Sequence, residues 1–290
     1  MSQDLATLPL SLERALVGEA IRMVRKSATH WTGFVLNGAT HPLEVCWDQG
    51  WLLFSEGSAR NFRPARGKDI WNALRRNTAA QGVGTVLTAH KQLLLCSELL
   101  LPDESDLGLR VRAVIESFLA AWDRLPPTAT AVADEWPGEM EARCAEAGWS
   151  CTRRATGRLT AALETTPVFQ ATITPLGEGA RFEVEAADLG TYSTASRMAA
   201  AVLALETSRH IRLVRATTDE AQSRIGFSVS LPGPIRSEEL AAGFAGLSAA
   251  MTATNEILAA LQNENLAGDY LAIRGWPAKK QNQKKERTHT

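Results

Sequence analysis

The side chains best able to do chemistry in this chain are its cysteines, and they are spread singly. The chain has four of them, at Cys46, Cys96, Cys144 and Cys151, and no two form a close Cys-x-x-Cys pair. Cys46 and Cys96 lie in apolar, β-like runs, where a thiol behaves as a small hydrophobic group. We therefore expect reduced, structural cysteines rather than a zinc or redox site.

The histidines and glycines do not indicate a reaction either. No pair of histidines has the spacing of metal ligands on one helix, so we expect no metal site. The chain lacks a Gly-x-Ser-x-Gly elbow, a phosphate-binding loop and a His-Glu-x-x-His motif. Gly82-Val83-Gly84 is only a Gly-x-Gly, which eases entry into a strand better than it holds a nucleotide. We predict no catalytic residue, no cofactor and no enzyme.

Composition argues against several other classes of function. The chain has 290 residues, of which 45% are hydrophobic and 22% charged, as in a globular protein with room for two domains. A net charge of −1 argues against nucleic-acid binding, which goes with a basic excess. No apolar run approaches the roughly 20 residues that span a bilayer. The N-terminus also lacks the basic start of a secretory signal, so we expect no membrane partner and a cytoplasmic location.

Apolar spacing predicts the elements of the first half. Helical periodicity over residues 11–26 indicates a first helix, with Ser11 as its cap. Turn signals then separate β-like runs, and a second helix interrupts them. The predicted elements are strands at 31–36, 43–47 and 51–54, a helix at 69–80, strands starting at 82–84 and at 92–101, and a helix from about 107. The first half is therefore predicted as α-βββ-α-ββ-α.

The same order recurs in the second half. Its predicted elements are a helix at 139–147, strands at 158–163, 170–175 and 181–186, a helix at 194–207, strands at 211–216 and 224–231, and a helix from Ser237. A Leu-Pro pair ends the last strand of each half, at 101–102 and at 231–232. We predict an α+β protein of two tandem domains, each an antiparallel sheet packed with helices, which form an intramolecular pseudo-dimer.

Composition places the domain boundaries. Pro126-Pro127 and the Thr/Ala-rich stretch after it are typical of a linker. We assign residues 1–126 to the first domain, 127–137 to the linker and 138–275 to the second domain. Residues 276–290 carry basic residues and no apolar anchor after Trp276, and we expect a disordered, solubilising tail. An alternative for the tail is contact with nucleic acid or an acidic surface.

The order of elements resembles the type III secretion chaperone-like fold. A Leu-Arg-Arg-Asn helix end at residues 74–77 precedes Gly82-Val83-Gly84, a strand and a second strand that ends in Leu-Pro-Asp, similar to the middle of that family's domain. The resemblance covers residues 10–125 and, by order alone, residues 138–265. It implies a non-catalytic cytoplasmic protein that holds a partner polypeptide. The chain departs from the family in being a tandem and in being nearly neutral.

The two halves differ in their last strands. In the second half, residues 225–231 alternate apolar with small polar side chains, which predicts one face exposed to water. In the first half, residues 93–96 and 99–101 are apolar on both faces, and the strand should be covered on both sides. The second domain or an extra helix could supply that cover, and so could an external partner.

Aromatic residues of the first half suggest where a partner would bind. Trp47, Trp51, Leu53 and Phe54 are our candidate partner-binding residues, because aromatic side chains dominate binding hot spots. The alternative is that all four lie in the core. The predicted function is a protein-binding chaperone or adaptor, either a monomer with an internal pseudo-dimer or a homodimer.

Two other functions stay open. One is a small-molecule binder or enzyme with its site in the cleft between domains. The other is a structural subunit that uses the last helix as its contact.

Overall fold

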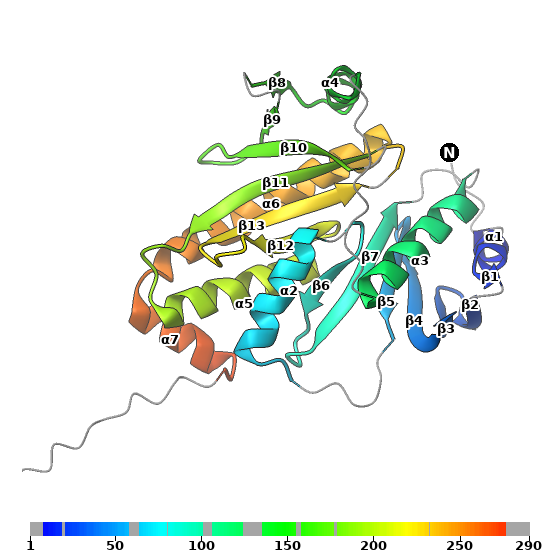
Figure 1. The fold of residues 1–290 in the computed structure, drawn as a ribbon, viewed down its shortest axis with the longest axis horizontal. Coiled ribbons are helices and arrows are strands. Elements are labelled where there is room, and N and C mark those ends of the chain that lie inside the picture. Colours follow the sequence, from blue (N-terminus) through cyan, green and yellow to red (C-terminus); the bar gives the residue numbers. More distant parts are fainter. Residues whose placement is uncertain are drawn as a thin grey trace, which may run out of the picture.

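The computed structural model describes residues 8–18, 21–57, 64–79, 81–100, 106–123, 135–154, 158–176, 179–231 and 233–276. Each half of the chain forms an antiparallel sheet flanked by helices, as Figure 1 shows. The α+β class predicted from the sequence is confirmed. Most of the predicted linker, nearly all of the basic tail and the first Leu-Pro pair lie outside the described residues.

The first sheet has seven strands in the order β1-β2-β3-β4-β5-β7-β6. They are β1 (Val17–Gly18), β2 (Ile21–Ser27), β3 (His30–Asn37), β4 (Ala39–Asp48), β5 (Trp51–Glu56), β6 (Gly84–Leu87) and β7 (Leu93–Leu100). Cross-strand neighbours Trp31, Val45 and Phe54 share one face and are buried. Helices α1 (Leu8–Ala15) and α3 (Leu107–Asp123) cover this face.

The second sheet has six strands in the order β12-β13-β11-β10-β9-β8. They are β8 (Cys151–Arg153), β9 (Leu159–Ala162), β10 (Gln170–Leu176), β11 (Gly179–Asp188), β12 (Val214–Thr218) and β13 (Arg224–Leu231). The long helix α6 (Ser237–Ala260) packs on one face of this sheet, where the rings of Phe182 and Phe244 meet edge to face. The apolar residues of α6 therefore serve its own domain. The half also contains α4 (Trp136–Glu146), α5 (Thr194–His210) and α7 (Glu264–Ile273).

The two sheets share a strand order. Strands β3-β4-β5-β7-β6 of the first correspond in sequence order to β9-β10-β11-β13-β12 of the second. The hairpins that close each order also correspond. Lys91 and Gln222 both adopt a left-handed backbone, with φ of 59° and 55°. Each donates its N–H to the carbonyl three residues earlier, on Thr88 and Asp219 respectively.

The first predicted helix is wrong over most of its length. Helix α1 ends at Ala15, and residues 21–27 form strand β2 instead of continuing the helix. Strand β2 pairs with β3, and its Ile21 and Met23 pack on the core while Val24 is exposed. This period-two burial shows that pairing with β3 overrides helical spacing. Strands β1 and β8 and helix α7 are also additions to the predicted order.

The halves exchange contacts through their middle helices. Helix α2 (Gly67–Ala79) lies against β12 and α5 of the second half, and α5 lies against β6 of the first half. Ile70, Ala73 and Leu74 of α2 belong to the hydrophobic cluster of the second half. Helix α5 is buried over most of its surface, which fits its many small alanines. One continuous core therefore crosses the boundary between the halves.

The prediction of a water-exposed face on β13 is wrong. Ser228 is buried, and so are its neighbours Arg181, Arg215 and Thr217 on the same face. This polar face turns toward the first half. Strand β7, apolar on both faces, is expected to be covered on both sides. The second half contacts it, because Glu98 of β7 accepts a hydrogen bond from Arg215 and Leu93 packs on the second-half cluster. The second half therefore supplies part of the cover of β7.

Candidate functional site

A buried amide links the two sheets at the centre of the junction. Asn77, near the end of α2, donates from Nδ2 to the carbonyls of Thr85 and Ala216, each at 2.9 Å. Its Oδ1 accepts the N–H of Thr85 at 2.6 Å. Thr85 lies on β6 and Ala216 on β12, so a single side chain holds the edge strands of both sheets. Both strands would otherwise leave buried polar groups without partners.

Ser208 has the corresponding place in α5. Its hydroxyl accepts the N–H of Ala216 at 2.7 Å and donates to the carbonyl of Ala204 at 3.1 Å. In both halves, a polar side chain near the helix end thus bonds the strand residue eight positions later. Asn77 differs because it also reaches across to the other half. The junction is therefore similar on its two sides but not identical.

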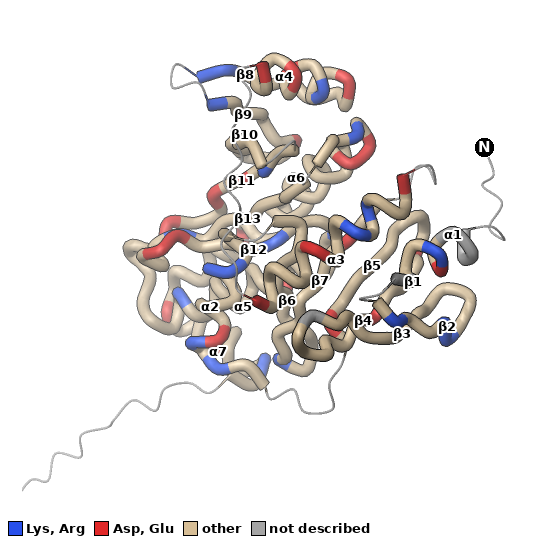
Figure 2. The backbone as a smooth tube through the Cα atoms, turned by 45° about the vertical axis from the view of Figure 1, so that its right-hand side comes forward, with Lys and Arg blue, Asp and Glu red and all other residues tan. Residues whose placement is uncertain are grey.

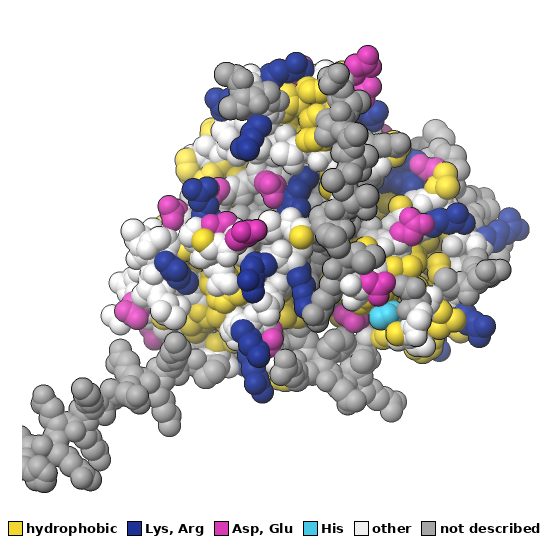
Figure 3. Space-filling model, in the orientation of Figure 1, with side chains coloured by type: hydrophobic (Ala, Val, Ile, Leu, Met, Phe, Trp, Pro, Cys, Tyr) yellow, Lys and Arg dark blue, Asp and Glu magenta, His cyan; other side chains and the backbone are white. Residues whose placement is uncertain are grey.

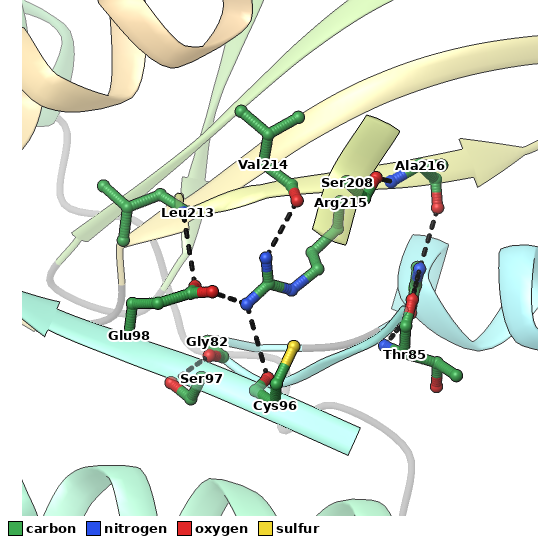
Figure 4. A network of polar contacts seen from close by, with 11 residues as sticks. Gly82, Thr85, Cys96, Ser97, Glu98, Ser208, Leu213, Val214, Arg215 and Ala216 are labelled. Atoms are coloured by element: carbon green, nitrogen blue, oxygen red, sulfur yellow. Dashed lines mark hydrogen bonds and ion pairs between the residues drawn. The ribbon is translucent and has the colours of Figure 1, made fainter. Parts of the chain in front are cut away.

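A buried ion pair between Arg215 and Glu98 lies at the same junction, as Figure 4 shows. Arg215 of β12 bonds the carboxylate of Glu98 on β7 and the carbonyls of Val214 and Cys96. Glu98 also accepts the backbone N–H of Leu213 at 3.2 Å. Burial alone would lower the pKa of Arg215. The neighbouring Cys96 and Glu98 raise this pKa by more than burial lowers it, so the net shift is upward. The guanidinium stays charged inside the junction.

Gly84 makes room for this arginine. A Cβ at Gly84 would lie 2.4 Å from Cδ of Arg215, closer than real side-chain atoms approach. The Gly82-Val83-Gly84 segment therefore does open strand β6, as expected, but its last glycine also accommodates a charge from the other half. Beside it, burial raises the pKa of the Cys96 thiol to about 12, which makes this cysteine inert.

A cavity of about 310 Å³ opens between the halves next to the ion pair. Both halves line it, through α3 and β7 on one side and β13 with the start of α6 on the other. Its apolar wall includes Leu99, Val114 and Leu231. Its size lies at the lower end of the range for small-molecule sites.

Charged residues cross the junction at one side of this cavity. Arg110 of α3 pairs with Glu239 of α6, and Arg236 pairs with Asp106 at 2.5 Å. Burial and then the nearby Arg236 lower the pKa of Arg110. Elsewhere on the described backbone, acidic and basic residues are interspersed, as Figure 2 shows. These two ion pairs fasten the start of α3 in the first half to the start of α6 in the second half.

The structure separates the four predicted partner-binding residues. Phe54 is 1% exposed and belongs to the core, and Trp47 packs on the same cluster. Trp51 and Leu53 point to the opposite face of β5 and are partly exposed. The guanidinium of Arg212, from the second half, lies 5.4 Å from the ring centroid of Trp51. The four side chains therefore do not form one surface.

The face of the first sheet opposite α1 and α3 exposes apolar side chains. Val24, Phe34 and Leu36 on β2 and β3 are 60%, 49% and 38% exposed. Register places Thr32 between Val24 and Glu44, so these strands share one outer face. Figure 3 shows one face of the molecule, on which charged and polar side chains break up the hydrophobic areas. We call the surface of Val24, Phe34 and Leu36 the outer patch.

Sequence reasoning missed the junction residues. Asn77 and Arg215 lie within a predicted helix and a predicted strand, and no local pattern distinguishes an interface from solvent. Strand alternation alone would have separated Phe54 from Trp51 and Leu53.

Among the described residues, no group of three or more His, Cys, Asp or Glu side chains could hold a metal ion. No helix in that part of the chain has the length and apolarity to cross a bilayer. Comparison with known proteins adds no relative, because no family model, curated protein or solved structure matches this chain.

Proposed function

We propose that this chain is a non-catalytic protein-binding chaperone or adaptor, built from two tandem chaperone-like domains that form an intramolecular pseudo-dimer. The observation that supports this architecture is the reciprocal packing of α2 on β12 and α5 on β6. The shared strand order and the matching hairpins at Lys91 and Gln222 support the tandem interpretation.

The partner would bind on the outer patch. Val24, Phe34 and Leu36 expose apolar area that neither α1 nor α3 covers. Leu53, one of the predicted binding residues, lies on the same face of the sheet. Exposed apolar groups on neighbouring strands suit an extended polypeptide segment with apolar side chains at alternate positions. The aromatic ring of Phe34 would give the largest single contribution to binding.

An affinity capture with matched variants tests this function. Tagged wild type, Phe34→Ser and Leu266→Ser would be incubated with lysate of the native cell, and retained proteins identified by mass spectrometry. Leu266 is 50% exposed on α7, so it matches Phe34 in exposure but lies away from the outer patch. We expect one stoichiometric protein on wild type and Leu266→Ser, reduced about ten-fold on Phe34→Ser. No retained protein at low salt, or equal retention by Phe34→Ser, would reject the proposal.

A second candidate function is small-molecule binding, and the cavity between the halves favours it. The apolar wall with Arg110, Arg236 and Glu239 at one side suits a small molecule with an apolar body and a polar head. A bulky residue at Ala113 on α3 would block the cavity, whereas Ala272 on α7 is an exposed alanine away from it. A compound that binds wild type and Ala272→Trp but not Ala113→Trp would support this function. Equal binding to all three would place the compound elsewhere.

A further inference from the structure

One wall of the cavity between the halves changes from charged to apolar along the start of α3. The carbonyl of Asp106, just before the helix, accepts the N–H of Arg110 at 3.1 Å, so these two residues lie one turn apart. Val114 follows one turn later on the same side of the helix. All three residues line the cavity. A molecule that lies along this wall would meet charges at one end and an apolar surface at the other.

The wall from the second half has the same division. Leu231, at the end of β13, supplies an apolar side chain, and Arg236 and Glu239 supply charges. Arg110 pairs with Glu239, and Arg236 pairs with Asp106, so the charged parts of both walls meet at one end of the cavity. The cavity therefore has a charged end that both halves build.

The ion pair between Arg236 and Asp106 leaves half of each charged group unpaired. Nη2 of Arg236 lies 2.5 Å from Oδ2 of Asp106. Within the described part of the chain, Nη1 of Arg236 and Oδ1 of Asp106 are buried and have no hydrogen-bond partner. A buried donor and a buried acceptor without partners are each costly. A ligand group that both accepts and donates hydrogen bonds at this place would satisfy both atoms.

The side chains at this end can turn toward such a ligand. The side chains of Arg236 and Asp106 are 23% and 35% exposed, and the last torsion of a carboxylate is broad, so either oxygen of Asp106 can face the cavity. Burial, and then the nearby Arg236, lower the pKa of Arg110. Two guanidinium groups this close to each other favour an anion between them. The charged end thus offers cations for an anionic group and a free carboxylate oxygen for a cationic one.

The other ion pair at the cavity has no such demand for an anion and a cation together. Arg215 and Glu98 bond each other, and between them they also bond the carbonyls of Val214 and Cys96 and the N–H of Leu213. These contacts belong to the junction itself. The charged end formed by Arg236 and its neighbours is therefore the place for the polar head of a ligand.

We propose that this cavity binds a free α-amino acid with an apolar side chain. The inference rests on the second candidate function, small-molecule binding between the halves. The carboxylate of the amino acid would accept hydrogen bonds from Arg110 and Arg236, and its ammonium group would donate to Asp106. Its side chain would lie against Val114 and Leu231. The volume of about 310 Å³ suits a ligand of this size.

Calorimetric titration of the full-length protein tests the two charges of the ligand separately. The probes are L-leucine and L-phenylalanine, each with two analogues that lack one charge. 4-Methylpentanoate and 3-phenylpropanoate lack the ammonium group, and 3-methylbutylamine and 2-phenylethylamine lack the carboxylate. We expect at least one of the two amino acids to bind, and both of its analogues to bind at least about ten-fold more weakly, because each loses charge-assisted hydrogen bonds. The inference is overturned if neither amino acid binds, or if an analogue binds as tightly as its amino acid.

Variants then locate the ammonium group. Asp106→Asn keeps the size of the side chain, and it should weaken binding of the amino acid about ten-fold without weakening the analogue that has only the carboxylate. Glu185→Gln is the matched control, because it neutralises an exposed carboxylate that does not line the cavity, and it should bind as the wild type does. Circular dichroism checks that each variant is folded, and the analogue series on the wild type needs no variant. Equal binding of the amino acid by Asp106→Asn and wild type would contradict the assignment.

A blocked cavity separates this inference from the function on which it rests. Ala113→Trp should abolish binding of the amino acid, whereas Ala272→Trp should not. Binding that survives in Ala113→Trp would overturn the inference, because the site would lie elsewhere. If the analogues bind as tightly as the amino acid and Ala113→Trp abolishes the binding of all of them, the cavity does bind small molecules but does not recognise an amino acid.

Discussion

Gly84 and Arg215 occupy corresponding positions in the two halves, yet they contribute opposite things to the junction. Gly84 contributes space, and Arg215 contributes a charged side chain that fills it. Asn77 and Ser208 show the same divergence, since both bond their own strand but only Asn77 bonds the other. The comparison teaches that, at this point of the junction, one half provides the space that a side chain of the other half fills.

The same contrast explains the polar face of β13. Alternating small polar residues there would suit solvent in a single domain. In this chain they face the first half. Arg181 of β11 donates to the carbonyls of Thr78 and Asn77 in the first half and to the hydroxyl of Ser228 on β13. The junction therefore combines an apolar side, around α2 and α5, with a polar side, around Arg215. Packing supplies affinity, and the polar groups fix the register.

The largest effect should come from breaking the buried ion pair. Arg215→Met would leave the carboxylate of Glu98, with a side chain only 13% exposed, without its cation. We expect a loss of about 3–5 kcal/mol in the free energy of unfolding, measured by urea denaturation. Adding Glu98→Leu should recover most of that loss, because no unpaired charge then stays buried.

The exposed pair Arg224–Glu185 provides the control for this measurement. Both of its side chains are more than half exposed. Arg224→Met should therefore change the free energy of unfolding by less than about 1 kcal/mol. If Arg215→Met costs no more than Arg224→Met, the ion pair does not fasten the junction.

A smaller effect should separate the bridging amide from its local counterpart. Asn77→Leu removes the partners of two carbonyls and one N–H, in both halves, and should cost about 2–4 kcal/mol. Ser208→Ala removes the partner of one N–H in its own half and should cost about 1–2 kcal/mol. Urea denaturation of both variants gives the comparison. Equal losses would mean that the contact between β6 and β12 does not depend on Asn77.

The sequence predicts most of this fold because most elements are set by local patterns. Strands β10 and β13 and helix α5 lie close to their predicted bounds, since alternation and capping act within a few residues. Strand β2 was missed because its pairing with β3 outweighs its helical spacing. The junction could not be predicted, because the alternation of β13 is the same whether water or Asn77 and its neighbours face it. Long-range contacts decide which polar face is exposed.

The smallest effect should appear in the hairpins that correspond between the halves. Asp219 and Thr88 both accept the N–H four residues later, on Ser223 and Gln92. Burial alone would raise the pKa of Asp219. Its hydrogen bonds with Ser223 and Arg224 lower this pKa by more than burial raises it, so the net shift is downward. A lowered pKa means that the ionised form stabilises the fold above the usual Asp range, and that this stability is lost as the pH falls through the lowered pKa.

Asp219→Asn should therefore reduce the free energy of unfolding at pH 7 and have less effect at pH 3. Asp219 is partly exposed and solvent screens its charge, so the difference should be at most about 0.5 kcal/mol. Thr88→Val, which removes an uncharged acceptor at the corresponding place, should give a loss that does not depend on pH, because nothing at residue 88 titrates. Urea denaturation at the two pH values measures both variants. A pH dependence equal in the two would show that the hairpin of the second half does not use its charge.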